Sequence, residues 1–136
     1  MPLVRIMTKS SKYNNSRRRI GDAIHQAMID TIDIPAKDRF QVFEVSPELI
    51  YDNSYLDISR SDDLIIIQIT LAPGRSLEKK RALYRRIAEL VSSAASIRQE
   101  DVFINLVETL PENWSFGLGL AQYADRPPPH LRSDNQ

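Results

Sequence analysis

The sequence has 136 residues, 42% of them hydrophobic and 26% charged, which is the length and composition of a single globular domain. Its 18 basic and 18 acidic residues give no net charge, so the basic excess of nucleic-acid-binding proteins is missing. The absence of cysteine excludes disulfides, thiolate metal sites and a cysteine nucleophile, and with two histidines a zinc site would need carboxylates to complete it.

The first residues, MPLVRIMTKSS, contain no long apolar run. We therefore expect neither a signal peptide nor a membrane span, and we expect a cytoplasmic protein.

The first half of the chain predicts a strand, a helix and a second strand. Residues 3–7 are apolar enough for a short buried strand. Apolar residues then recur with helical spacing over 20–31, which predicts an amphipathic helix that ends before Pro35. Residues 39–45 have the pattern of a second strand.

The second half repeats this order after a loop. Residues 46–62 are rich in turn formers and predict a loop with at most a small hairpin. The strongest predicted strand covers 63–71, a helix begins after Ser76, and a fourth strand covers 101–108. Three consecutive prolines predict that residues 125–136 form a loose C-terminal tail.

The two halves align without a gap at a shift of 63 residues. At that shift core positions of the predicted strands and helices match, for example Ile6 with Ile69, and Asp38 matches Asp101. We interpret residues 2–45 and 63–108 as two β-α-β units within one domain that covers 1–124.

Two such units predict an α+β fold, with four strands in one sheet and two helices. Right-handed crossovers place both helices on the same face of that sheet. The strand DLIIIQITL at 63–71 is apolar at nearly every position, as in strands that are buried on both faces. Another copy of the chain is therefore expected to cover the open face, which makes the protein an oligomer.

Pro2 begins the first strand directly. Methionine is commonly removed before a small second residue, and its removal would leave the secondary amine of Pro2 at the edge of the sheet. Apolar surroundings lower the pKa of an amine. Such a group suits proton transfer near neutral pH, although proline also simply tolerates the start of a strand.

Several short segments resemble the tautomerase superfamily, and most of all its malonate semialdehyde decarboxylase group. They are the N-terminal MPL, IPAKDRFQ at 34–41, RSDD at 60–63, APGRS at 72–76 and WSFGLG at 114–119. The resemblance runs over nearly the whole chain. It implies paired β-α-β units in a tautomerase-like fold that assembles as a homotrimer, and a reaction without a cofactor or metal.

The resemblance also implies roles for individual residues. The proton-transferring proline falls on Pro2, its acidic partner on Asp38, and the arginine that binds the substrate carboxylate on Arg75. Trp114 and Phe116 match an aromatic wall that limits water around the reacting carbons. Some decarboxylases of the group carry two arginines in an R-P-R arrangement, whereas this chain has the single arginine of APGR at 72–75.

Two further residues are candidates for contact with the substrate. Arg60 could bind it or could pair with the acidic residues at 62 and 63, and Tyr123 could lie at the rim of the pocket.

These features predict an enzyme acting on small oxo acids, as a tautomerase or as a decarboxylase. A hydratase of unsaturated acids, with Asp38 activating the water, is one alternative. A non-catalytic oligomeric binding protein with the same fold is another. We expect no nucleic-acid or membrane partner.

Overall fold

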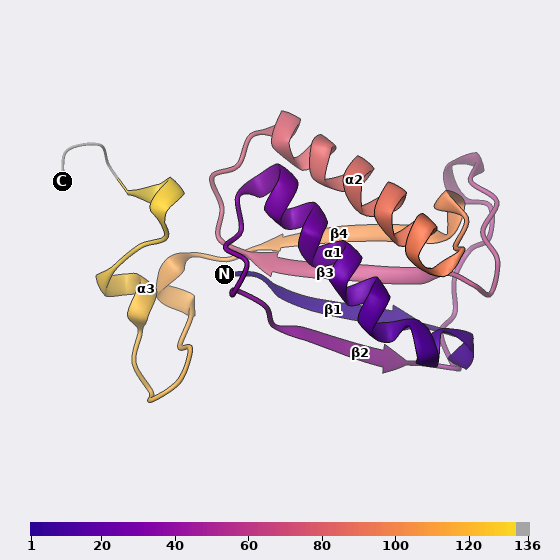
Figure 1. Cartoon of the computed structure of the whole chain (residues 1–136), viewed down its shortest axis with the longest axis horizontal. Coiled ribbons are helices and arrows are strands. Elements are labelled where there is room, and N and C mark those ends of the chain that lie inside the picture. Colours follow the sequence, from indigo (N-terminus) through magenta and orange to yellow (C-terminus); the bar gives the residue numbers. More distant parts are fainter. Residues whose placement is uncertain (133–136) are drawn as a thin grey trace.

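The computed structural model describes residues 1–132, which contain a four-stranded sheet in the order β2-β1-β3-β4. Two long helices pack on this sheet, and a short one lies beside its end (Figure 1). The elements are β1 (Leu3–Thr8), α1 (Arg17–Ile32), β2 (Gln41–Val45), β3 (Ile65–Leu71), α2 (Leu77–Ala95), β4 (Val102–Glu108) and α3 (Gln122–Asp125).

The sheet is built from two β-α-β units that meet at its centre. β1 pairs with β2 and β3 pairs with β4 in parallel, while β1 and β3 run antiparallel with Ile6 opposite Ile67. A shift of 63 residues carries the last residues of β1, α1 and β2 onto those of β3, α2 and β4. The predicted α+β fold with a tandem repeat is therefore confirmed.

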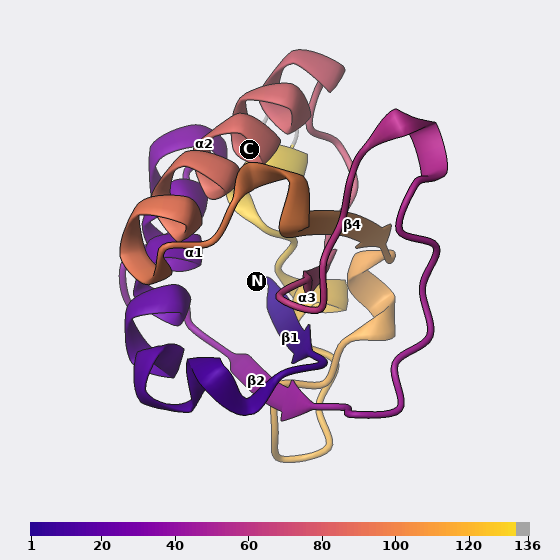
Figure 2. The ribbon, with the colours of Figure 1, turned by 90° about the vertical axis from the view of Figure 1, so that its right-hand side faces the viewer.

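Both helices lie on one side of the sheet (Figure 2), and the hydrophobic core fills the space between the helices and the sheet. In β3, alternate side chains from Ile65 to Leu71 point to the helices and are at most 2% exposed. Ile24 of α1 and Ile87 of α2, both 0% exposed, meet them from the other side. Burial of each such side chain contributes about 1.5–3 kcal/mol.

The helix ends follow local rules. Ser76 caps α2 by accepting the backbone N–H of Lys79. α1 ends at Asp33 and α2 at Ser96, both in the left-handed conformation and equivalent in the repeat. The left-handed Asp33 thus ends α1 two residues before Pro35, and the chain turns back toward the sheet at that point.

The other face of the sheet carries a mixed set of side chains. Between its buried residues β3 presents Ile66, Gln68 and Thr70, which are half-buried, and β4 presents Phe103, which is 45% exposed. The Gln68 side chain donates from Nε2 to the side-chain oxygen Oδ1 of Asn105 at 3.2 Å. β3 is thus less apolar on this face than its composition suggested, and a covering second copy stays a prediction.

The C-terminal segment returns to the end of the sheet where the chain begins (Figure 1). Pro128 is buried, and a short turn at Pro129–Leu131 packs against the loop before α2. The sequence predicted a loose tail over residues 125–136. The structure describes its residues 125–132, part of which contact the domain, and residues 133–136 lie outside the described part. The domain boundary at 124 stays a prediction.

Among residues 1–132, no helix is long and apolar enough to cross a membrane.

Candidate active site

The amino terminus of the chain is enclosed at one end of the sheet. Pro2 is buried, and Val4, two residues further along, joins the sheet by donating to the Phe40 carbonyl at 2.9 Å. The α-amino group on Met1 lies 3.3 Å from Oδ2 of Asp38 and donates to the hydroxyl of Tyr123 at 3.0 Å. Two segments distant in sequence, one with Asp38 and Phe40 and one with Tyr123, therefore converge on the first residues.

Asp38 comes from the turn between α1 and β2. Its backbone N–H donates to the Pro35 carbonyl at 3.0 Å, which fixes the turn. Its side chain is only 14% exposed, and Oδ1 is buried with no hydrogen-bond partner among the described residues. This oxygen is thus an acceptor that a water or a substrate group can use.

Arg75 comes from the turn between β3 and α2. Gly74 precedes it with a φ of +113°, a conformation that glycine adopts without the steric cost of a Cβ. The guanidinium donates from Nη1 to the Ala72 carbonyl at 3.2 Å and from Nη2 to the Ile32 carbonyl at 3.5 Å. Burial lowers the pKa of Arg75, but a guanidinium remains charged at physiological pH.

Three aromatic side chains form a wall beside the amino terminus. The rings of Trp114 and Phe116 stack at 5.3 Å, and Phe116 meets Tyr123 edge-on at 4.6 Å. Gln122 holds their loop, because it accepts the Phe116 N–H at 3.0 Å and donates to the Gly117 carbonyl at 2.9 Å.

The charges at the site act on the Tyr123 hydroxyl and on the terminal amine. Burial raises the pKa of Tyr123, Asp38 raises it further, and Arg75 opposes the change. For the amino group, burial lowers the pKa, Asp38 raises it and Arg75 lowers it, with a net lowering. An amine in this position loses its proton more readily than one in water.

Two cavities meet at Met1, which lines both of them. One, of about 220 Å³, is mainly apolar and lies between Pro2, Phe40, Trp114 and Phe116. The other, of about 370 Å³, contains Arg75 together with Lys79, Tyr123 and His130. The terminal residues thus separate an apolar space from a cationic one, an arrangement that suits a small carboxylate with carbon atoms next to its charged group.

The structure brings six of the seven predicted site residues together and places Arg60 elsewhere. Arg60 donates to the carbonyls of Tyr55 and Ile58, and it lines a separate cavity before β3. Because β1 and β3 are antiparallel, the start of β3 lies at the end of β1 away from Pro2. Within one chain Arg60 therefore stabilises the loop at 55–60, and its contact with substrate stays a prediction.

Sequence reasoning missed two residues at the site. Phe40 comes two residues after Asp38 and lines the apolar cavity, and its position inside the IPAKDRFQ segment was a usable signal. His130 lies 3.2 Å from Nη1 of Arg75. Nothing in the sequence around His130 predicted this contact, since the preceding prolines indicated a loose segment.

The family model of the tautomerase enzymes matches residues 38–117. A probable tautomerase of Bacillus subtilis (strain 168), YusQ, is 44% identical over 125 residues, which cover 90% of this chain and 98% of the relative. The crystal structure of FG41 malonate semialdehyde decarboxylase inhibited by 3-bromopropiolate has a TM-score of 0.83 at 35% identity, covering 90% of this chain and 95% of that one.

A second malonate semialdehyde decarboxylase has a TM-score of 0.82 at 28% identity, and its structures are presented as the basis of its decarboxylase and hydratase activities. The alignment covers 90% of this chain and 96% of that one.

Proposed function

Because this chain belongs to the tautomerase family, we propose that it is a cofactor-free enzyme that uses the amine of Pro2 to move protons on small oxo acids. The proposal rests on the position of the amino terminus: the Met1 amine lies 3.3 Å from the Asp38 carboxylate and 3.0 Å from the Tyr123 hydroxyl, and Pro2 follows it directly into the same buried end of the sheet. An α-amino group held in this way at a cavity has no evident structural purpose, whereas it suits acid–base chemistry.

Removal of Met1 is the step that makes Pro2 competent. While Met1 is attached, the nitrogen of Pro2 is an amide and cannot accept a proton. Once Met1 is gone, the ionisable group at this end of the sheet is the secondary amine of Pro2, and we expect Asp38 and Arg75 to be its charged neighbours. Removal also vacates the space that Met1 occupies between the two cavities.

As a tautomerase, the enzyme begins with a neutral Pro2. Arg75 holds the substrate carboxylate, the amine takes the proton from the enol oxygen, and the 2-oxo group forms. The ammonium then gives a proton to C3, so that the amine is neutral again. Asp38 stabilises the ammonium between the two transfers, and the aromatic wall keeps water from the carbanionic carbon.

As a decarboxylase, the enzyme begins with a protonated Pro2. The ammonium donates a hydrogen bond to the 3-oxo group, the bond to the carboxylate breaks, and carbon dioxide leaves. The electron pair is taken up as an enolate, and transfer of the proton of the Pro2 ammonium to its carbon gives the aldehyde; the neutral amine then takes a proton from water. The names of the two malonate semialdehyde decarboxylases favour this activity, while the single arginine in APGR, in place of R-P-R, argues against a close copy of their site.

Two alternatives use the same residues differently. A hydratase would add water to an unsaturated acid, with Asp38 activating the water through its free Oδ1. A non-catalytic binding protein would keep the fold and the Arg75 cavity without turnover. The hydratase variant is favoured by the description of one relative, which includes a hydratase activity.

We also propose that the chain works as a homotrimer, as the resemblance implies. The support from the structure is the open face of the sheet, where Phe103 and Val42 are each more than two-fifths exposed. Apolar side chains gathered on one face of a sheet are typical of an interface between subunits.

Three proteins test the use of Pro2, with the enol of an aryl 2-oxo acid and malonate semialdehyde as substrates. The wild type should convert at least one of them. Pro2→Ala, which replaces a secondary amine by a primary one, should lose most of the activity, roughly a hundredfold. An alanine inserted between Met1 and Pro2 keeps every side chain but leaves Pro2 acylated after Met1 is removed, and it should be inactive. Full activity of the insertion variant would refute the proposal.

A further inference from the structure

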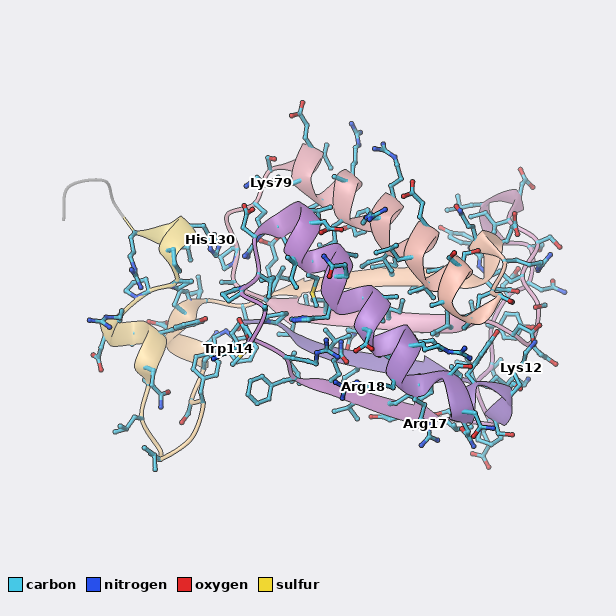
Figure 3. The ribbon with its side chains drawn as sticks, viewed as in Figure 1. Lys12, Arg17, Arg18, Lys79, Trp114 and His130 are labelled. Carbon is cyan, nitrogen blue, oxygen red and sulfur yellow. The ribbon has the colours of Figure 1, made fainter. Side chains whose placement is uncertain are left out.

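His130 reaches into the cationic cavity from the C-terminal segment. Figure 3 shows it at the same end of the molecule as Trp114 and Lys79, and away from Lys12 and Arg17. The segment that carries it is held in place. Leu131 packs onto Gly74, where a Cβ would lie 2.8 Å from the leucine side chain, and Arg132 donates to the Pro127 carbonyl at 2.8 Å.

One nitrogen of His130 lies within hydrogen-bond distance of a donor and of an acceptor, so it cannot bond to both in the same protonation state. Nε2 lies 3.2 Å from Nη1 of Arg75, which can only donate, and 3.0 Å from the carbonyl oxygen of Pro73, which can only accept. A neutral ring with a bare Nε2 accepts from Arg75. A protonated ring must donate from Nε2, so it bonds to Pro73 and gives up the bond to Arg75.

The hydrogen bond to His130 decides how many N–H donors of Arg75 remain free to bind a ligand. Nη1 carries two hydrogens, and the Ala72 carbonyl takes one of them at 3.2 Å. If His130 takes the other, Nη1 has nothing to offer a ligand. Nη2 makes one long bond of 3.5 Å, to the Ile32 carbonyl. A carboxylate that binds both Nη atoms in the bidentate manner therefore needs His130 to release Nη1.

We propose that His130 is a positioning residue that controls the carboxylate site of Arg75 through its own protonation. In its neutral form it occupies Nη1 of Arg75, and in its protonated form it turns to Pro73, frees Nη1 and adds a second positive charge to the cavity. The inference rests on the proposed function only in that Arg75 binds a carboxylate, and it does not depend on proton transfer by Pro2.

The groups around His130 fix the direction of the effect. Burial lowers its pKa, the Pro73 carbonyl raises it, and Arg75, the terminal amine and Lys79 lower it, with a net lowering. The other charged or titratable groups of the cavity are Tyr123 and Asp33, whose carboxylate pairs with Lys79 at 3.3 Å. The free protein thus carries a neutral His130 at neutral pH.

A bound carboxylate reverses this preference. Its negative charge beside the ring favours the protonated form, so that binding raises the pKa of His130. Binding is then linked to the uptake of a proton, and carboxylates bind more tightly as the pH falls.

Phenylacetate, an unreactive carboxylate, tests the proposal, with phenylacetamide as the uncharged control. Titration calorimetry at about pH 8 and about pH 5.5 should show phenylacetate binding about tenfold more tightly at the lower pH, which corresponds to one pKa unit of coupling. Runs in buffers of different ionisation enthalpy report the proton uptake. In NMR spectra the His130 ring should titrate at higher pH with phenylacetate bound, while the buried His25, which holds the Ala36 carbonyl, serves as the internal reference.

Two variants separate control by a proton from a structural role. In His130→Gln the amide oxygen accepts from Arg75 while the amide nitrogen donates to Pro73, so both partners are satisfied without titration. Its phenylacetate affinity should stay at the weak level that the wild type shows at high pH. His130→Ala frees Nη1 at every pH, so its affinity at high pH should not fall below that of the wild type. Comparison with the wild type removes the contribution of the terminal amine.

The outcomes distinguish this inference from the proposed function. Proton uptake and pH dependence in His130→Gln equal to those of the wild type would overturn the role of His130. An equal loss of affinity in both variants at both pH values would also overturn it, because that result marks a structural residue. Proton-linked binding in a protein without any turnover would refute the proposed function alone. The absence of phenylacetate binding to the wild type at both pH values would overturn the inference, while turnover of an oxo acid that Pro2→Ala abolishes would still support the proposed function.

Discussion

Asp38 and Asp101 occupy equivalent positions in the two β-α-β units, and their carboxylates have different kinds of partners. Asp101, 0% exposed, accepts from the backbone N–H and the hydroxyl of Ser61, both at 2.7 Å, and pairs with Arg98 at 3.3 Å. Asp38 faces the amino terminus and keeps one oxygen without a partner among the described residues. The repeat thus provides one structural carboxylate and one at the proposed site.

Substitution by asparagine should lower stability at position 101 and activity at position 38. Asp101→Asn loses charge-assisted hydrogen bonds in a buried place and should lower the free energy of unfolding by about 2 kcal/mol. Asp38→Asn should leave stability nearly unchanged and lower kcat/KM roughly a hundredfold. Urea unfolding and steady-state kinetics measure the two effects. An Asp38→Asn enzyme with full activity would remove Asp38 from the mechanism.

Stability should fall in acid because of Asp101. Burial by itself raises the pKa of this carboxyl, but the hydrogen bonds from Ser61 and Arg98 outweigh it and lower the pKa overall. A carboxyl with a lowered pKa in the folded protein stabilises above its unfolded pKa, and the contribution is lost as the pH falls through the folded pKa. The difference in unfolding free energy between the wild type and Asp101→Asn should therefore shrink toward low pH. A constant difference would contradict this assignment.

The pH–rate profile should depend on the pair of Asp38 and the terminal amine. For the tautomerase reaction kcat/KM should rise with pH, because the neutral amine is the base, whereas for the decarboxylase it should fall. Asp38 raises the pKa of the Met1 amine, and we expect it to act in the same way on the Pro2 amine that replaces it. Asp38→Asn should therefore move this limb to lower pH in its residual activity. Asp33→Asn is the matched control, because Asp33 pairs with Lys79 and should leave the limb in place.

The aromatic wall should act through the ring faces. The indole nitrogen of Trp114 is buried with no hydrogen-bond partner among the described residues, so Trp114→Phe sacrifices no bond within the chain. We expect Trp114→Phe to retain KM, and Trp114→Ala to raise it about tenfold through the lost apolar contact. If Trp114→Phe is as impaired as Trp114→Ala, the indole N–H binds the substrate directly.

The open face of the sheet should control the oligomeric state. Phe103→Glu places a charge at the proposed interface between subunits, which sedimentation should report as a shift from trimer to monomer. Leu77→Glu is a matched control on α2, on the side of the sheet that carries the helices, where the side chain is 60% exposed. A trimer that survives Phe103→Glu would place the interface elsewhere.

Much of the fold was predictable because its signals are periodic and occur twice. The strand at β3, the cap at Ser76 and the equivalence of Asp38 and Asp101 can all be read from the chain alone, whereas the alternation of buried and half-buried residues along β3 differs from the two-sided burial that its composition suggested. The convergence of Asp38, Arg75 and Trp114 on Pro2 came from the resemblance, since residues so far apart in sequence share no periodic signal. The contact of His130 with Arg75 depends on how the segment after α3 folds back, and no local pattern encodes that path.

Intact mass spectrometry of the active enzyme tests the central claim most directly, because only an unacylated Pro2 can serve as the base. We predict a mass lower than that of the full sequence by one methionine residue, with activity proportional to the processed fraction. A fully active preparation in which every molecule keeps Met1 would contradict the mechanism.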